Sequence, residues 1–140
     1  LGYAQLLRLE ELVGEKRHLL QQYRSIFADI PDVYLNPEPP EGRNGAWCTA
    51  LIVGKSHGLD KEQVIAELAE LGFEGRPFFY PLSAMPAYGG ETVDKKENAP
   101  IAYDLSRRGI CLPAAFRTSE AELTAYCNAV RSVLGVKTWV

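Results

Sequence analysis

Residues 46–72, with the sequence AWCTALIVGKSHGLDKEQVIAELAELG, contain the two local signals that decide the fold. Residues 46–54 form a short apolar run rich in strand formers, which predicts a buried strand. Asp60 can then cap a helix, and Gln63, three positions later, can return the hydrogen bond. Gly72 supplies a left-handed stop. Apolar residues at helical spacing form the buried stripe of this helix: Val64, Ile65, Leu68 and Leu71.

Upstream, residues 1–30 are predicted to form one long amphipathic helix that Pro31 stops. Its apolar positions recur at three- and four-residue steps: Leu9, Leu12, Val13, Leu20, Tyr23, Phe27 and Ile30. A helix of about 28 residues is about 42 Å long, which exceeds what a small domain needs. We therefore expect part of it to contact a partner or a missing domain, and we expect the chain to be a piece of a longer protein. Residues 36–45 predict a turn-rich loop.

Downstream, four segments follow in order: a short strand at 73–80, a loop at 83–98, a helix at 99–108 and a strand at 110–113. Pro77 favours an edge position or a strand end, because proline cannot donate to a sheet ladder. Ser119 and Glu122 form a second capping box, which begins the last helix. The elements predict an α+β protein with a small three-stranded sheet and helices packed on one face.

Composition excludes several classes of function. The chain has 140 residues, of which 46% are apolar and 24% charged, as is normal for a globular protein. Its net charge of -3 and the absence of a basic stripe argue against nucleic acid as a partner. No apolar run is long enough for a membrane span, and no signal peptide is evident. We expect a soluble, cytoplasmic protein without a membrane partner.

The cysteines and histidines do not predict a metal site. Cys48, Cys111 and Cys127 are far apart and lie within apolar patterns, so they are interpreted as reduced core thiols. His18 and His57 lack the paired spacing of zinc ligands and are interpreted as surface residues.

Residues 53–58, VGKSHG, resemble the end of a phosphate-binding loop. That motif needs a glycine five residues before Gly54, where this chain has Thr49. A turn between strand and helix explains the glycines. No complete catalytic constellation occurs elsewhere in the chain.

Residues 74–90, EGRPFFYPLSAMPAYGG, depart from a simple packing pattern. Arg76 lies between a glycine and a proline, so its guanidinium can be preorganised for a two-pronged bond with a carboxylate or phosphate. The aromatic rings of this segment suggest a groove for a flat or sugar-like ligand. In the alternative, Phe79 and Leu82 belong to the core, Arg76 is a surface ion-pair residue and the prolines steer a crossover.

Three blocks of sequence resemble the C-terminal part of the DegT/DnrJ/StrS sugar-nucleotide aminotransferases. These blocks are GYAQLLRLEELVGEKRHLLQQYRSIFADIPDV, LAELGFEGRPFFYPLSAMPAY and LSRRGICLPAAFRTSEAELTAYCNAVRSVL. Their sequences are most similar to those of the perosamine-synthase-like members. The resemblance implies the small C-terminal domain of the aspartate-aminotransferase fold of pyridoxal-phosphate-dependent enzymes, with a mainly antiparallel three-stranded sheet and a long N-terminal interdomain helix.

The resemblance also implies a division of labour. Residues 1–140 would form a single domain, with the helix at 1–30 followed by an α/β sandwich at 46–135. The large cofactor-binding domain, with the Schiff-base lysine and the acid that pairs with the pyridine nitrogen, would lie outside this chain. This chain would then hold no catalytic or cofactor-binding residue and would be inactive alone. The parent enzyme, a homodimer, would move an amino group from glutamate to a keto sugar on a nucleotide.

By position in the family block, Arg76 is expected to hold a carboxylate or the substrate's phosphate, and three rings would flank the sugar: Phe78, Tyr80 and Tyr88. Many members have a histidine where this chain has Ser83 and a glutamine where it has Met85, so these two positions are expected to set substrate preference. The alternative function is a non-catalytic binding or dimerisation module that reuses the fold.

Overall fold

The computed structural model describes residues 2–90, 92–115 and 118–139. At its centre lies a four-stranded sheet in the order β1-β2-β4-β3, and every neighbouring pair is antiparallel. The strands are β1 Val33–Leu35, β2 Thr49–Val53, β3 Arg76–Pro77 and β4 Gly109–Leu112. The prediction of an α+β fold with mainly antiparallel strands is confirmed, but the predicted number of three strands is wrong.

Strand β1 is the element that sequence patterning missed. Three residues are too few to show an alternation, and a tertiary contact positions them instead. Asp32, at φ 56°, precedes the strand, and its carboxylate accepts hydrogen bonds from the backbone N–H and hydroxyl of Ser56 at 2.9 and 2.7 Å. These bonds from Ser56 lower the pKa of Asp32 to about 2. Strand β1 can then pair with β2, with Val33 opposite Val53.

The helices are α1 Gly2–Leu6, α2 Leu9–Ile26, α3 Lys61–Glu70, α4 Val93–Asn98, α5 Pro100–Arg108 and α6 Glu120–Val133. The single predicted helix at 1–30 is therefore wrong at two places, and its first residue, Leu1, lies outside the described residues. The helix is interrupted between α1 and α2, and α2 ends at Ile26 before reaching Pro31. At that end, the Ile26 carbonyl accepts a hydrogen bond from the Arg131 side chain at 2.7 Å, so a residue far along the chain caps the last turn.

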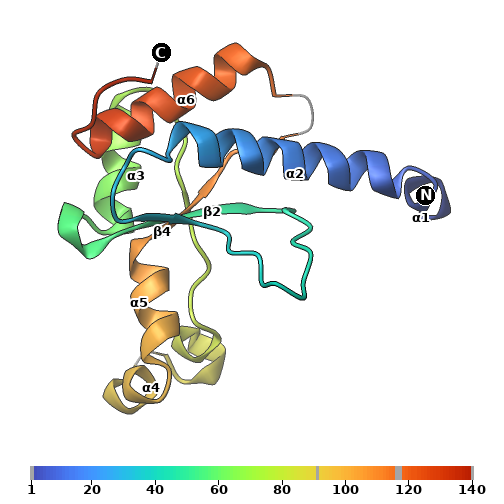
Figure 1. Ribbon diagram of the computed structural model, residues 1–140. Helices are drawn as coiled ribbons and strands as arrows, with labels where there is room; N and C mark the ends of the chain where they lie inside the picture. Colours follow the sequence, from blue (N-terminus) through green and yellow to red (C-terminus); the bar gives the residue numbers. More distant parts are fainter. Residues whose placement is uncertain (1, 91, 116–117, 140) are drawn as a thin grey trace.

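The hydrophobic core lies between one face of the sheet and the helices α2, α3 and α6 (Figure 1). Alternate residues of the two central strands face these helices, and Leu51, Val53, Ile110 and Leu112 are all at most 3% exposed. Tyr23 of α2 is completely buried, and its hydroxyl donates to the Pro113 carbonyl at 2.7 Å. The long helix thereby closes over the two central strands.

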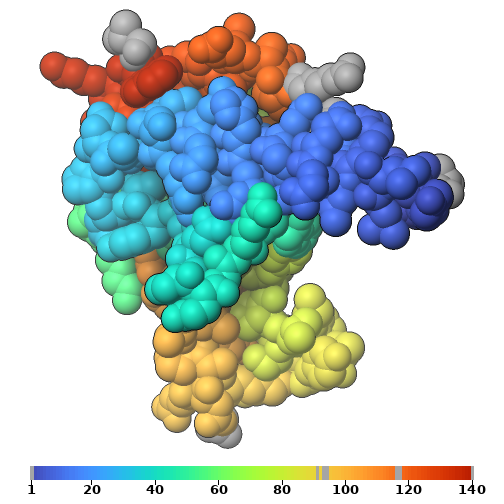
Figure 2. Space-filling view, turned by 45° about the vertical axis from the view of Figure 1, so that its right-hand side comes forward, coloured from blue at the N-terminus to red at the C-terminus, as the bar shows by residue number. Residues whose placement is uncertain are grey.

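Helices α4 and α5 lie on the other side of the sheet from α2 and α6, so the expectation of helices on one face holds only for α2, α3 and α6 (Figure 1). Together with residues 80–90 they form a projection, yellow to orange in Figure 2. The predicted loop at 83–98 is also corrected, because it contains α4 and short 3-10 turns at Leu82–Ala84 and Pro86–Tyr88. Within that range, residue 91 lies outside the described residues.

Local capping signals were reliable. Both predicted capping boxes are confirmed, at Asp60 with Gln63 and at Ser119 with Glu122. Gly72 adopts the left-handed conformation, at φ 83°. The residues that resemble a phosphate-binding loop form a single 3-10 turn, Lys55–His57, between β2 and α3, as the turn interpretation predicted.

The predicted ends of the strands agree less well with the structure than the predicted helix caps do. The predicted strand at 46–54 covers only Thr49–Val53, and the predicted strand at 73–80 covers only Arg76–Pro77. The second of these is an edge strand, as Pro77 indicated. Over the residues that the structure describes, no helix combines the length and the hydropathy that crossing a membrane would require.

Candidate functional site

The sheet has a second face that α2, α3 and α6 do not cover, which we call the open face and define by Ala50, Ile52, Cys111 and Arg76. The register places Ala50 opposite Cys111 and Arg76 opposite Cys111, so these three side chains form one cross-strand row. Because side chains alternate along a strand, this row points away from the buried Ile110. Arg76 is therefore directed to the open face by its place in β3.

Phe78 extends the open face beyond the end of β3. Its backbone N–H donates to the Gly109 carbonyl at 2.9 Å, which continues the pairing of the two strands. A Cβ at Gly109 would lie 2.7 Å from the Cβ of Phe78 and 2.8 Å from the Ile52 side chain. The glycine therefore allows the phenylalanine and the isoleucine to approach each other across β4.

Arg76 borders a cavity of about 510 Å3 beside this edge of the sheet. The cavity is lined by Trp47, Cys48, Glu74, Arg76, Cys111, Leu112, Pro113, Ala114, Ala115 and Tyr126. The Arg76 side chain is 75% exposed, and its Nε lies 3.4 Å from a carboxylate oxygen of Glu74, which is equally exposed. Ion pairs of this kind contribute little to stability. The guanidinium is thus held loosely enough to change partner for an incoming carboxylate or phosphate.

An aromatic cluster flanks this cavity. The rings of Trp47 and Phe79 lie 5.9 Å apart, and those of Phe78 and Phe79 lie 5.6 Å apart in an edge-on arrangement. Trp47 is 72% exposed and was missed as a site residue, because the apolar run at 46–54 predicted that it lies in a buried strand. No local signal in the sequence showed that the strand begins only at Thr49.

Phe79 and Leu82 are 58% and 69% exposed, so the interpretation of these residues as core is wrong. The other part of that alternative, Arg76 as a surface ion-pair residue, agrees with its contact to Glu74.

Tyr80 lies in a second cavity of about 320 Å3, between α3, α5 and the 3-10 turn at Leu82–Ala84. The ammonium of Lys61 lies 3.8 Å from the centre of the Tyr80 ring. Asp104, on α5, is bonded to Arg108 at 2.5 Å and to Lys55 at 3.3 Å. The bond from Arg108 is the main cause that lowers the pKa of Asp104.

The remaining predicted residues lie on the projection. The hydroxyls of Ser83 and Tyr103 hydrogen-bond at 3.0 Å, whereas Met85 and Tyr88 are 40% and 62% exposed. Arg76 lines the first cavity and Tyr80 lines the second, so the predicted residues do not border one common cavity. The structure brings Arg76 and Phe78 together on the open face and places the others apart from them.

Two of the three cysteines correct the expectation of core thiols. Cys127 is completely buried, but Cys48 and Cys111 are half-buried and line the first cavity. Burial, followed by a hydrogen bond with Cys48, raises the pKa of Cys111 to about 12. The Cys111 thiol therefore stays protonated near neutral pH and is a poor nucleophile.

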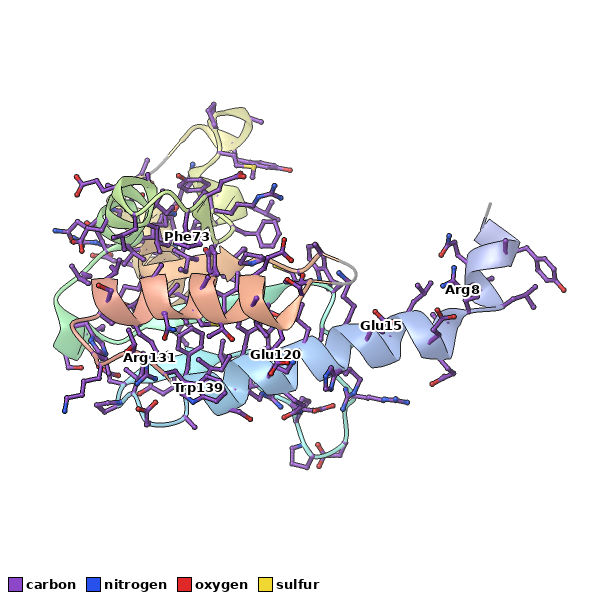
Figure 3. All side chains as sticks on the ribbon, turned by 90° about the horizontal axis from the view of Figure 1, so that it is seen from above. Arg8, Glu15, Phe73, Glu120, Arg131 and Trp139 are labelled. Carbon is purple, nitrogen blue, oxygen red and sulfur yellow. The ribbon has the colours of Figure 1, made fainter. Side chains whose placement is uncertain are left out.

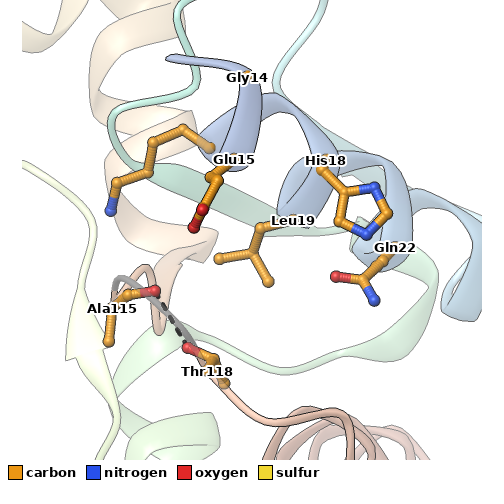
Figure 4. A pocket seen from close by; sticks show the side chains of 8 residues that line it. Gly14, Glu15, His18, Leu19, Gln22, Ala115 and Thr118 are labelled. Carbon is orange, nitrogen blue, oxygen red and sulfur yellow. Dashed lines mark hydrogen bonds between the residues drawn. The ribbon is translucent and has the colours of Figure 1, made fainter. Parts of the chain in front are cut away.

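A further cavity of about 330 Å3 runs along α2 and is shown in Figure 4. There the Thr118 hydroxyl donates to the Ala115 carbonyl at 3.1 Å. His18 is exposed at its rim, and the His57 ring lies 3.0 Å from the Pro31 carbonyl, as expected for surface residues. We assign no function to this cavity. Within the described ranges, no group of three or more side chains could hold a metal ion.

The chain was compared with known proteins. Residues 1–131 match the DegT/DnrJ/EryC1/StrS aminotransferase family. The GDP-perosamine synthase of Vibrio cholerae is 28% identical over 132 residues, which cover 94% of this chain and 35% of that protein. EpsN of Bacillus subtilis (strain 168), assigned to the pyridoxal phosphate-dependent aminotransferases, is 31% identical over 122 residues, which cover 86% of this chain and 31% of that protein.

Among solved structures, the aminotransferase TlmJ from Streptoalloteichus hindustanus has a similar fold, with a TM-score of 0.77 at 22% identity. The match covers 96% of this chain and 35% of TlmJ. The chain thus spans about a third of the length of the relatives that it matches.

Proposed function

Because the chain belongs to the DegT/DnrJ/EryC1/StrS aminotransferase family, we propose that it is the C-terminal part of an enzyme that moves an amino group onto a keto sugar carried by a nucleotide. The observation that carries this proposal is the match over residues 1–131. The names of relatives support the substrate class, since one is a GDP-perosamine synthase and another a dTDP-4-amino-4,6-dideoxy-D-glucose transaminase. We propose glutamate as the amino donor.

The family uses pyridoxal phosphate, and the described residues of this chain do not fit that cofactor. Such a site needs a lysine that reaches the cofactor and a carboxylate that can pair with its ring nitrogen. Lys61 is the buried lysine, but its ammonium lies over Tyr80. The nearby Asp104 carboxylate is already bonded to Arg108 and Lys55. This misfit supports a cofactor-binding domain outside these 140 residues, beside which the present chain forms one small domain.

The exposed apolar side chains at the N-terminal end of the chain fit such an arrangement. Figure 3 shows α1 and the first turns of α2 extending beyond the rest of the molecule. Large apolar side chains there are 47–76% exposed: Tyr3, Leu6, Leu7 and Leu9. Burial of this surface against a large domain or a second subunit would be favourable, because water is removed from apolar area. We propose that the parent enzyme is a homodimer and that this helix contributes to its interfaces.

In the parent enzyme, we propose that the open face borders the substrate. Arg76 would bind a carboxylate or the nucleotide's phosphate, and Phe78 would contact the sugar. Trp47, which was not predicted from the sequence, would contact the sugar as well. Tyr80, Ser83, Met85 and Tyr88 would act from the adjoining projection, with Ser83 and Met85 setting substrate preference. The local support is the loose ion pair of Arg76 beside an aromatic cluster.

The first prediction concerns Arg76. In the full-length enzyme, Arg76→Ala should raise the KM for the nucleotide sugar by about 10- to 100-fold, because one charge-assisted hydrogen bond is worth roughly 1.5–3 kcal/mol. Arg43→Ala is the matched control, since Arg43 is also exposed and pairs weakly with Glu10 at 4.0 Å. Steady-state kinetics with both variants provide the measurement. An unchanged KM would leave Arg76 as a surface ion-pair residue.

The second prediction concerns the cofactor. The 140-residue chain, incubated with pyridoxal phosphate and then desalted, should retain no absorbance of bound cofactor. A protein extended upstream by a large domain should retain it. Stoichiometric retention by the short chain would contradict the proposed division of labour.

A further inference from the structure

The second cavity contains the buried ammonium group of Lys61, which makes only long contacts with hydrogen-bond acceptors. Lys61 is 2% exposed, and an ammonium has three N–H donors. Its Nζ lies 3.5 Å from the Ser106 hydroxyl, longer than an ordinary hydrogen bond, and 4.0 Å from a Glu62 carboxylate oxygen. The ring of Tyr80, 3.8 Å away, offers attraction without accepting a conventional hydrogen bond. Burying a charge in this way is costly unless strong partners compensate.

The charges around this cavity favour an anion. Lys61 and Arg107 line it as cationic side chains, and Glu62 and Asp104 line it as acidic ones. Asp104 is neutralised by its bonds to Arg108 and Lys55, outside the cavity lining. The Glu62 side chain is 63% exposed and therefore well screened by water.

Hydroxyl groups complete the lining. Tyr80, Tyr103 and Ser106 contribute them, and the Ser83 hydroxyl bonds to that of Tyr103. Such hydroxyls can rotate to donate to an oxyanion while the ammonium supplies charge. The cavity volume of about 320 Å3 is several times the roughly 30 Å3 share of one water in the liquid.

We propose that the second cavity is a binding site for a tetrahedral oxyanion of the phosphate class, with Lys61 as its central charge. Ser106 and Tyr103 supply donors from α5, and Arg107 supplies a second charge at the rim. The site is separate from the cavity that Arg76 borders. It shares Tyr80 with the substrate-binding residues proposed above, but its central charge, Lys61, is not among them.

The test is thermal unfolding of the 140-residue chain in potassium phosphate and in potassium chloride, at equal pH and ionic strength. With phosphate at ten times its dissociation constant, the midpoint should rise by about 5 °C relative to chloride. Lys61→Met keeps the apolar stem and removes the charge, and should abolish this rise. Lys137→Met is the matched control, because the Lys137 side chain is exposed and does not line the cavity, and should keep the rise.

If Lys61→Met lacks a cooperative transition by circular dichroism, Arg107→Gln serves in its place and should reduce the rise by about half. This residue is exposed, so its replacement leaves the core intact. An equal midpoint in phosphate and chloride would overturn the proposal. So would a full phosphate response in whichever of the two variants folds.

A second arm identifies the source of the anion. A nucleoside diphosphate is compared with inorganic phosphate at equal concentration. A larger response to the nucleotide that also requires Lys61 indicates a phosphate group of a nucleotide ligand. A response to inorganic phosphate alone indicates the free anion, and both results support an oxyanion site.

Discussion

Replacement of Arg131 by alanine should lower the free energy of unfolding by about 3–4 kcal/mol. Arg131, on α6, is 2% exposed and joins three parts of the chain (Figure 3). Its guanidinium donates to the Ile26 carbonyl at 2.7 Å, to the Lys137 carbonyl at 2.6 Å and to both carboxylate oxygens of Asp29 at 2.6 and 2.7 Å. Alanine would leave the buried Ile26 carbonyl without this donor and would open a cavity.

Urea denaturation followed by circular dichroism measures this loss. Asp29→Asn is the comparison, since the Asp29 side chain is 60% exposed and asparagine keeps an acceptor. It should cost clearly less than Arg131→Ala, because an exposed partner is screened by water. If Arg131→Ala lowered the free energy of unfolding no more than Asp29→Asn does, the ion pair with Asp29 would account for the whole stabilising effect of Arg131. The buried bond to Ile26 would then not stabilise the end of α2.

Gly54→Ala should lower the free energy of unfolding by about 3 kcal/mol, because the chain has no space for a side chain there. The Gly54 N–H donates to the Asp32 carbonyl at 2.7 Å, which draws the two segments together. A Cβ at Gly54 would collide with both the carbonyl and the carboxylate of Asp32. Since Gly54 has an ordinary φ of -69°, the loss comes from this collision and not from backbone conformation.

Gly14→Ala is the matched control for this substitution. Gly14 lies inside α2, and a Cβ there would meet nothing within 4 Å. Alanine should raise the free energy of unfolding by about 0.5–1 kcal/mol, because glycine weakens a helix interior. The same denaturation experiment compares both variants. Similar effects of the two substitutions would contradict the close approach of Gly54 to Asp32.

The sequence predicted those elements whose signals are local. The capping boxes at Asp60 and Ser119 and the stop at Gly72 are confirmed, because each depends on residues within one turn of the chain. The family resemblance is confirmed for the same reason, since contiguous blocks of sequence carried it. Within the candidate site, Arg76 and Phe78 could be selected from the segment at 74–90 alone.

Elements that depend on distant partners could not be predicted in this way. Strand β1 pairs with the edge of β2, and the Ser56 backbone N–H donates to the carboxylate of Asp32, the residue before the strand. The last turn of α2 is capped by Arg131, which follows Ile26 by 105 positions. Trp47 has the composition of a strand residue, yet it is exposed because pairing with β4 begins only at Thr49.

By itself, the sequence determined the class of the fold, the family and the segment that bears the candidate site. Helical periodicity, helix caps and a buried strand each depend on residues that are close in the sequence. They can therefore be recognised without knowing the rest of the molecule. Only the tertiary structure decided which face each side chain occupies. It directed Arg76 to the open face through its pairing with Cys111, and it buried Lys61 beneath Tyr80. Strand register and long-range packing set those positions, and both depend on residues far apart in the chain.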